Sequence, residues 1–127
     1  MAVTVTTLQD GSKYRVIHAF VDTADATDVV VYDYSADTNN PNGSASSGRI
    51  LKGWVFGHGG ADGEVEFDGT TDFPVIHLPA STAACIDYSS IGGVPNKATS
   101  PTGDVTITTT GVNATDHLQI IFVLYKH

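Results

Sequence analysis

The chain has 127 residues, of which 41% are hydrophobic and 16% are charged, and its formal net charge is −8. This length is typical of one domain, so we expect a single domain spanning residues 1–127. The six Lys and Arg residues are scattered along the sequence. Nucleic-acid binding requires clustered cations that displace counterions from phosphates, so we expect no nucleic-acid partner, and no attraction to an anionic membrane.

Short runs of Val, Ile, Thr and aromatic residues alternate with Gly, Asp and Asn, a pattern that predicts strands joined by turns. The first strands are expected at residues 2–8, 13–21 and 28–34. In the second of these, alternation places Ile17, Ala19 and Val21 on one face. The third, DVVVYDY, is apolar enough to predict a strand buried on both faces.

The middle of the chain begins with a long polar segment, residues 35–48, whose Asn-Pro and Asn-Gly pairs predict a loop. Strands follow at 49–56, 64–67 and 74–78, and a weaker one at 83–88. Strict alternation in 49–56 places Ile50, Trp54 and Phe56 on one face. The proline that opens 74–78 is typical of a strand start or a sheet edge.

The last two strands, 103–110 and 118–126, are predicted to form a hairpin. Val105 and Ile107 would face the core, while the alternate threonines would face solvent or another subunit. The chain thus has eight or nine short strands and no helical periodicity. We predict an all-β fold, a single antiparallel β-sandwich or jelly roll with little helix.

An acidic stripe, Asp62, Glu64, Glu66 and Asp68, would project from one face of its strand. A solvated face explains the stripe best, and a charged interface with a basic partner is the next interpretation. Calcium binding is disfavoured, because calcium usually requires a loop that wraps around the ion.

A second acidic group, Asp22, Asp25 and Asp28, lacks the glycine and terminal glutamate of an EF-hand loop, so turn chemistry explains it without a metal. The histidines show no metal-binding spacing. We therefore expect no metal and no cofactor.

Catalytic signatures are also missing from the sequence. His58-Gly59-Gly60 is interpreted as a glycine turn, because no G-x-S-x-G elbow accompanies it. Cys85 is the single cysteine, and we interpret it as a buried structural residue. Trp54 lies in an apolar run and is predicted to be core rather than part of a sugar-binding platform. We therefore expect no enzymatic activity.

Residues 1–9 lack the basic and apolar regions of a signal peptide, so we expect synthesis and folding in a cytoplasm. The longest apolar stretch, Leu118–Tyr125, is too short to span a bilayer.

The order of segments along the chain carries a family resemblance. It runs from MAVTVTTLQDG through KYRVIHAFV, DVVVYDYSA, GRILKGWVF and FDGTTDFPVIHLP to TGDVTITTTG and LQIIFVLYKH. This layout resembles small virion structural proteins encoded near the capsid genes of tailed bacteriophages, often marine or cyanobacterial ones.

The resemblance implies a capsid decoration (cement) protein of β-sandwich or jelly-roll type, made in the host cytoplasm and located on the capsid surface. Its partners would be the major capsid protein and copies of itself, as trimers or dimers. A tail- or head-associated virion module, or a bacterial carbohydrate-binding β-sandwich, is the alternative.

The contact sites that we expect lie in three places: the N-terminal strand, the polar loop and the threonine face. The residues are Val3, Thr4, Val5, Thr6, Thr7, Asn39, Asn40, Asn42, Thr106, Thr108 and Thr110.

Overall fold

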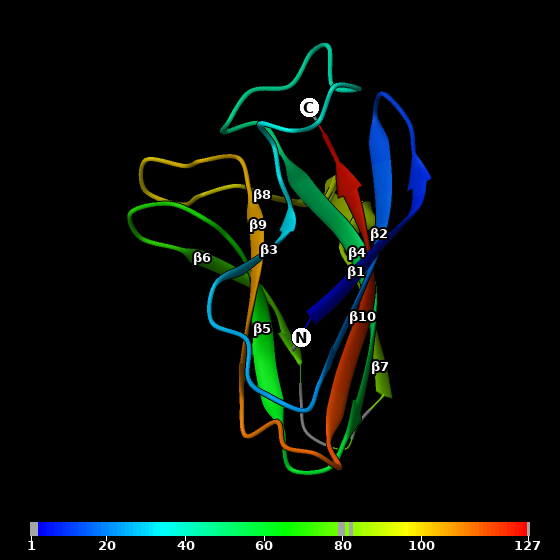
Figure 1. Ribbon diagram of the computed structural model, residues 1–127. Helices are drawn as coiled ribbons and strands as arrows, with labels where there is room; N and C mark the ends of the chain where they lie inside the picture. The colour runs from blue at the N-terminus through cyan, green and yellow to red at the C-terminus, as the bar shows by residue number, and fades with distance from the viewer. Residues whose placement is uncertain (1–2, 79–80, 82, 127) are drawn as a thin grey trace.

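The computed structural model describes residues 3–78, 81 and 83–126. The chain forms two antiparallel sheets that face each other (Figure 1). In chain order the elements are β1 (Val3–Asp10), β2 (Tyr14–Asp22), β3 (Val29–Tyr32), β4 (Arg49–His58), β5 (Asp62–Phe67), β6 (Phe73–Leu78), β7 (Ala83–Asp87), η1 (Ser89–Ile91), β8 (Val94–Pro95), β9 (Val105–Thr110) and β10 (His117–Tyr125). The prediction of an all-β sandwich is confirmed.

Sheet A has the strand order β1-β2-β10-β4-β7, with β8 pairing to β4. Sheet B has the order β3-β9-β5-β6. Among the described residues, no helix is long and apolar enough to cross a membrane.

The core lies between the sheets and follows from strand alternation. Ile17, Ala19 and Val21 of β2, which alternation placed on one face, are fully buried, and so are Ile107 of β9, as predicted, and Phe122 of β10. Burying a side chain of the size of Ile or Phe contributes about 1.5–3 kcal/mol. The sandwich is therefore held mainly by the inward-facing residues of both sheets.

The predicted hairpin between the last two strands is wrong. β10 pairs with β2 and β4 in sheet A, whereas β9 pairs with β3 and β5 in sheet B. The segment between them crosses from one sheet to the other, so β9 and β10 belong to opposite layers. Alternation identifies each strand and its buried face, but it does not say which strand lies beside it.

The strand expected to be buried on both faces is also placed differently. β3 is a short edge strand of sheet B, and Val30 is 43% exposed. An apolar run of this length does not by itself distinguish a central strand from an edge. The edge position expected from Pro74 is confirmed for β6.

A β-bulge explains a third correction. Val123 pairs with Lys52 while the next residue, Leu124, pairs with Ile50, so Leu51 is an extra residue in β4. The bulge shifts the alternation by one. Ile50 therefore faces the core, whereas Trp54, predicted to share its face, lies on the opposite face.

A buried ion cluster fixes the long loop at 35–48. Lys126 Nζ lies 2.7 Å from Asp10 Oδ1 and 2.9 Å from Asp37 Oδ2, and it donates to the Asn39 carbonyl oxygen at 2.9 Å. Arg15 binds Asp37 at 3.2 Å. The side chains of Lys126 and Asp37 have no exposed surface, so the loop is joined to the β1–β2 turn and to the end of β10.

Ionisation of the cluster follows from these contacts. Burial opposes ionisation of Asp37, but the hydrogen bonds from Lys126, Tyr32 and the Asn39 amide, with the charge of Arg15, outweigh it and lower its pKa. Hydrogen bonds from Arg15 and Lys126 likewise lower the pKa of Asp10. Both carboxyls are therefore anions at neutral pH.

Candidate functional site

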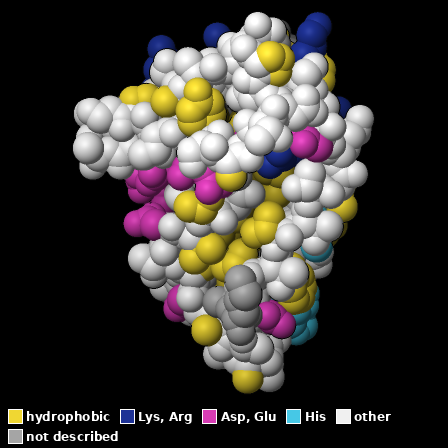
Figure 2. Space-filling model, turned by 45° about the horizontal axis from the view of Figure 1, so that its top comes forward, with side chains coloured by type: hydrophobic (Ala, Val, Ile, Leu, Met, Phe, Trp, Pro, Cys, Tyr) yellow, Lys and Arg dark blue, Asp and Glu magenta, His cyan; other side chains and the backbone are white. Residues whose placement is uncertain are grey.

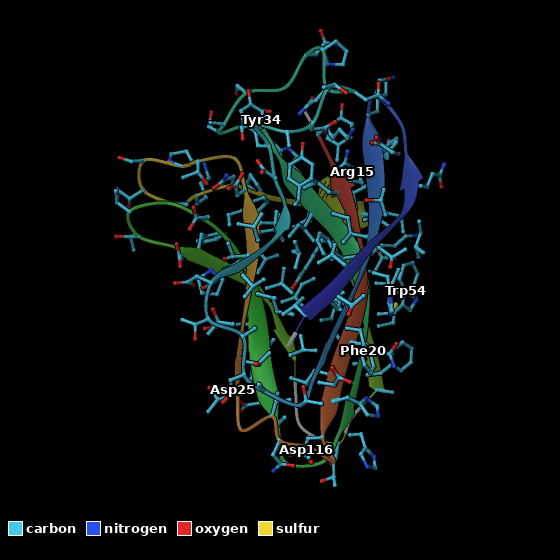
Figure 3. The ribbon with its side chains drawn as sticks, viewed as in Figure 1. Arg15, Phe20, Asp25, Tyr34, Trp54 and Asp116 are labelled. Carbon is cyan, nitrogen blue, oxygen red and sulfur yellow. The ribbon has the colours of Figure 1, made fainter. Side chains whose placement is uncertain are left out.

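The outer face of sheet A is unusually apolar for a surface that faces away from the core. The same alternation that buries one side of β2, β4 and β10 places large side chains on the other side. Figure 3 shows Trp54 and Phe20 projecting from sheet A on the side away from sheet B. We call this surface the aromatic face; it comprises Tyr14, Val16, His18, Phe20, Lys52, Trp54, Phe56, Gln119, Ile121, Val123 and Tyr125.

The register of the strands brings these residues side by side. Ile121 lies between His18 of β2 and Trp54 of β4, and Gln119 lies between Phe20 and Phe56. His18 Nε2 and Gln119 Oε1 are 3.1 Å apart. The residues thus form a continuous layer across the three central strands.

Ring contacts hold parts of this layer in place. The rings of Phe20 and His117 stack at 5.5 Å, and those of His117 and His58 at 5.1 Å. Lys52 Nζ lies 5.6 Å from the centre of the Trp54 ring. Side chains that are already held in one position lose less entropy when a partner binds.

A shallow depression of about 390 Å³ lies at one end of the aromatic face. It is lined by Tyr14, Leu51, Ser89, Gly92 and Tyr125. The two tyrosine rings are 5.3 Å apart and inclined by 49°. Depressions lined by aromatic rings and small polar groups accept an apolar side chain or the ring of a small ligand.

Two surface assignments made from the sequence are wrong. Trp54 is half-buried on the outer face and not a core residue, because of the bulge at Leu51. Cys85, expected to be buried, is exposed on β7 and pairs in register with Trp54. β7 lies at one edge of sheet A, opposite β1, where its side chains have fewer neighbours. The glycine turn is confirmed, since Gly59 has φ +88°.

The expected contact residues of the N-terminal strand lie along the other edge of sheet A, where no described strand pairs with the outer side of β1. Val3 is buried, whereas the residues that follow it in β1 are exposed, including Val5 at 40%. β1 carries no charge between Val3 and Gln9. An uncharged strand with a free edge is open to pairing with another strand.

The polar loop contributes less accessible surface than its composition indicates. Asn39 and Asn42 are exposed, but Asn40 is half-buried and its Nδ2 donates to the Tyr32 hydroxyl at 3.4 Å. The loop at 35–48 is therefore fixed in position by its contacts with the rest of the protein.

The threonine face lies on the outer side of sheet B. Thr110 is exposed, Thr108 is half-buried, and Thr106 is only 1% exposed, so the expectation of an open threonine row is wrong for Thr106. The neighbouring acidic stripe is also not uniformly solvated, because Glu66 is only 6% exposed. Burial and the negative charges around it raise the pKa of Glu66.

Asp25 has the turn role predicted for it. Its carboxylate accepts hydrogen bonds from the backbone N–H of Val112 at 2.8 Å and of Gly111 at 3.2 Å, and from the Thr109 hydroxyl at 3.3 Å. Asp25 thereby ties the β2–β3 loop to the crossing between β9 and β10. These backbone hydrogen bonds hold the pKa of Asp25 below its ordinary value.

The aromatic face as a unit is absent from the sequence-based prediction. The available signal is the presence of apolar residues at both parities in KYRVIHAFV and LQIIFVLYK. A strand that is apolar on both faces packs one face against the core, and its other face is a candidate surface for contact with another protein.

Comparison with known protein families, with curated proteins and with solved structures finds no match for this chain.

Proposed function

We propose that this protein is a bacteriophage capsid decoration (cement) protein that binds the outer capsid through its aromatic face and stabilises contacts between major capsid subunits. The observation that carries the proposal is the aromatic face, a continuous layer of large side chains across the three central strands of sheet A. The resemblance of the segment layout to phage virion structural proteins supports the choice of partner.

The chemistry of the aromatic face fits a protein partner. Tyr, Trp and Phe are enriched at protein interfaces, and a few buried aromatic anchors supply most of the binding energy. Tyr14 and Phe56 are 45% and 43% exposed, so much of their surface is available to a partner. The remaining residues of the face would exclude water around these anchors.

The dimensions of sheet A are also suitable. A nine-residue strand extends roughly 30 Å, and five strands spaced about 4.8 Å apart span roughly 20 Å, which gives about 600 Å². This is near the ~800 Å² per partner of a standard interface. The exposed edge of β1 and the loop at 35–48 would supply additional contacts, and repeated copies on a symmetric shell would add avidity.

The proposal is tested by adding the purified protein to capsids assembled without it, then measuring co-sedimentation and imaging the particles by electron microscopy. Phe56→Ala should weaken capsid binding by at least 10-fold, since loss of a buried aromatic anchor costs about 2 kcal/mol. Val30→Ala on sheet B is the control, because Val30 and Phe56 are both 43% exposed. Absence of the protein from capsids, or equal binding by the two variants, would refute the proposal.

A carbohydrate-binding module, in a phage tail or in a bacterium, is the second candidate. Trp54 on the surface favours it, together with the tyrosine-lined depression, since flat aromatic rings stack against sugar rings. Tyr32 lies on β3 of the other sheet and is 3% exposed, so it does not extend this aromatic surface. A glycan array and quenching of Trp54 fluorescence test this candidate, and silence in both assays removes it.

A further inference from the structure

Three carboxylates that are distant in the sequence converge on the outer face of sheet B. Oxygen atoms of Asp28, Glu66 and Asp72 all lie within 4.8 Å of one another. Asp28 precedes β3, Glu66 belongs to β5, and Asp72 precedes β6. Figure 2 shows acidic side chains gathered on the flank where sheet B lies, with Lys and Arg mainly at the top of that view.

The convergence occurs above Thr106. Thr106 of β9 pairs in register with Val30 on one side and with Glu66 on the other. Along the strand direction, Asp28 lies on one side of the row formed by Val30, Thr106 and Glu66, and Asp72 lies on the other. Their carboxylates can therefore approach each other only over this row. Thr106 therefore forms the floor of the cluster, which explains why it is 1% exposed on an outward-facing position.

The floor contains an unpartnered oxygen. Thr106 Oγ1 is buried and has no hydrogen-bond partner among the residues that the structure describes. A buried hydroxyl without a partner is unfavourable, because the group has lost water and gained nothing in exchange. It offers a neutral oxygen ligand beneath three carboxylates.

The Thr108 hydroxyl in the cluster lies next to more carboxylate oxygens than it can donate hydrogen bonds to. Thr108 Oγ1 accepts the Asp28 backbone N–H at 3.0 Å and lies 3.1 Å from both Asp28 Oδ1 and Glu66 Oε1. A hydroxyl has one proton, so it can donate to only one of these carboxylates at a time. The other carboxylate oxygen then faces lone pairs, which a cation would relieve.

The charge balance leads to the same conclusion. Asp72, Glu64 and Asp28 all act on Glu66, and all three are acidic. Glu66 is itself 94% buried, being 6% exposed. Buried charges are normally paired with an opposite charge or bound to a metal.

We propose that Asp28, Glu66 and Asp72, with the Thr106 hydroxyl beneath them, form a Ca²⁺ site that links all four strands of sheet B. The ligands are oxygens, which Ca²⁺ prefers, and its Ca–O distances of about 2.3–2.6 Å place opposite ligands about 4.8 Å apart. Glu66 belongs to the acidic stripe of the sequence and Asp28 belongs to the second acidic group, whereas Asp72 is in neither.

The test is thermal unfolding of the full chain, stripped with EDTA and dialysed, in CaCl₂, MgCl₂ or NaCl at equal ionic strength. At a Ca²⁺ concentration tenfold above Kd, the melting temperature should rise by about 5 °C. Calorimetric titration with CaCl₂ should give one ion per chain. A Ca²⁺ effect no larger than that of NaCl overturns the proposal, and an equal Mg²⁺ effect overturns the assignment to calcium.

The variant Glu66→Gln separates a metal site from a merely structural carboxyl. Removing one of three crowded negative charges should raise the melting temperature without Ca²⁺ and abolish the Ca²⁺-dependent rise. Asp62→Asn is the matched control, since Asp62 lies on the same face of β5 but is exposed, and it should retain the rise. Asp72→Asn gives a second loss-of-site variant. Retention of the rise in both Glu66→Gln and Asp72→Asn, or its loss in Asp62→Asn, overturns the proposal.

Discussion

Replacing Lys126 by methionine should destabilise the protein far more than its position one residue beyond β10 indicates. The ammonium group is fully buried and contacts Asp10, Asp37 and the Asn39 carbonyl. Methionine keeps most of the side-chain volume but removes the charge, so Asp37 is left buried with Arg15 as its remaining cation. Removing one partner of a buried ion pair costs about 3–5 kcal/mol, and the retained Arg15 contact places the expected loss near the lower end, about 3 kcal/mol.

Urea unfolding followed by circular dichroism measures this loss. For a slope of about 1.5 kcal/mol per molar urea, the midpoint should fall by about 2 M. Lys13→Met is the control, because Lys13 is exposed in the turn before β2, and it should leave the midpoint almost unchanged. The double variant Lys126→Met/Asp37→Asn should lose less than the sum of the single changes, because both remove the same contact. A loss below about 1 kcal/mol for Lys126→Met would refute the idea that this cluster stabilises the fold.

Four further predictions follow from the structure. The pKa values of Asp10 and Asp37 are lowered in the folded protein. Their ionisation therefore stabilises the fold above the ordinary carboxyl pKa of about 4, and this stabilisation is lost as pH falls through their folded-state pKa values. Urea midpoints measured from pH 7 to pH 2 should accordingly fall less steeply in Lys126→Met than in the wild type. Exposed Cys85 should react with a maleimide in the native state, and labelling that requires denaturant would contradict its position. Asp25→Ala should remove the amide hydrogen-exchange protection of Val112, whose N–H the carboxylate accepts, while unchanged protection would exclude this role. Gly103→Ala should lower the free energy of unfolding by about 2 kcal/mol. Gly103 has φ +88°, a conformation that L-residues disfavour, and an added Cβ would lie 2.5 Å from the Tyr34 ring. A change in melting temperature of less than 2 °C would contradict this prediction.

The strands were the most predictable part of the fold, because alternation is a local property of the sequence. The spacing of Ile17, Ala19 and Val21 places them on one face but does not say which face is buried, because the other face of the strand is also apolar. Pro74 indicated a strand start or an edge, and β6 is an edge strand. The bulge at Leu51 could not be anticipated, since one extra residue leaves no compositional mark. It reversed the assignment of Trp54.

The sites were less predictable than the strands because they depend on register between distant segments. Glu66 and Asp28 belong to two separate acidic groups of the sequence, and nothing in the sequence pairs them. Their meeting with Asp72 requires β3, β9, β5 and β6 to be aligned in a particular way. Similarly, nothing local connects Asp37 in a polar loop with Lys126, 89 positions later, although their contact holds that loop in place.

The position of β10 determines when folding can be completed during synthesis. This strand is encoded near residue 120, yet it lies in the centre of sheet A, between β2 and β4. Until residues 117–126 leave the ribosome, β2 and β4 have no strand between them, and their apolar inner faces have no central partner. At translation rates of about 5–20 residues per second, this incomplete state lasts for several seconds. Sheet A can therefore be completed only late in synthesis, when β10 pairs with two strands that were made long before it.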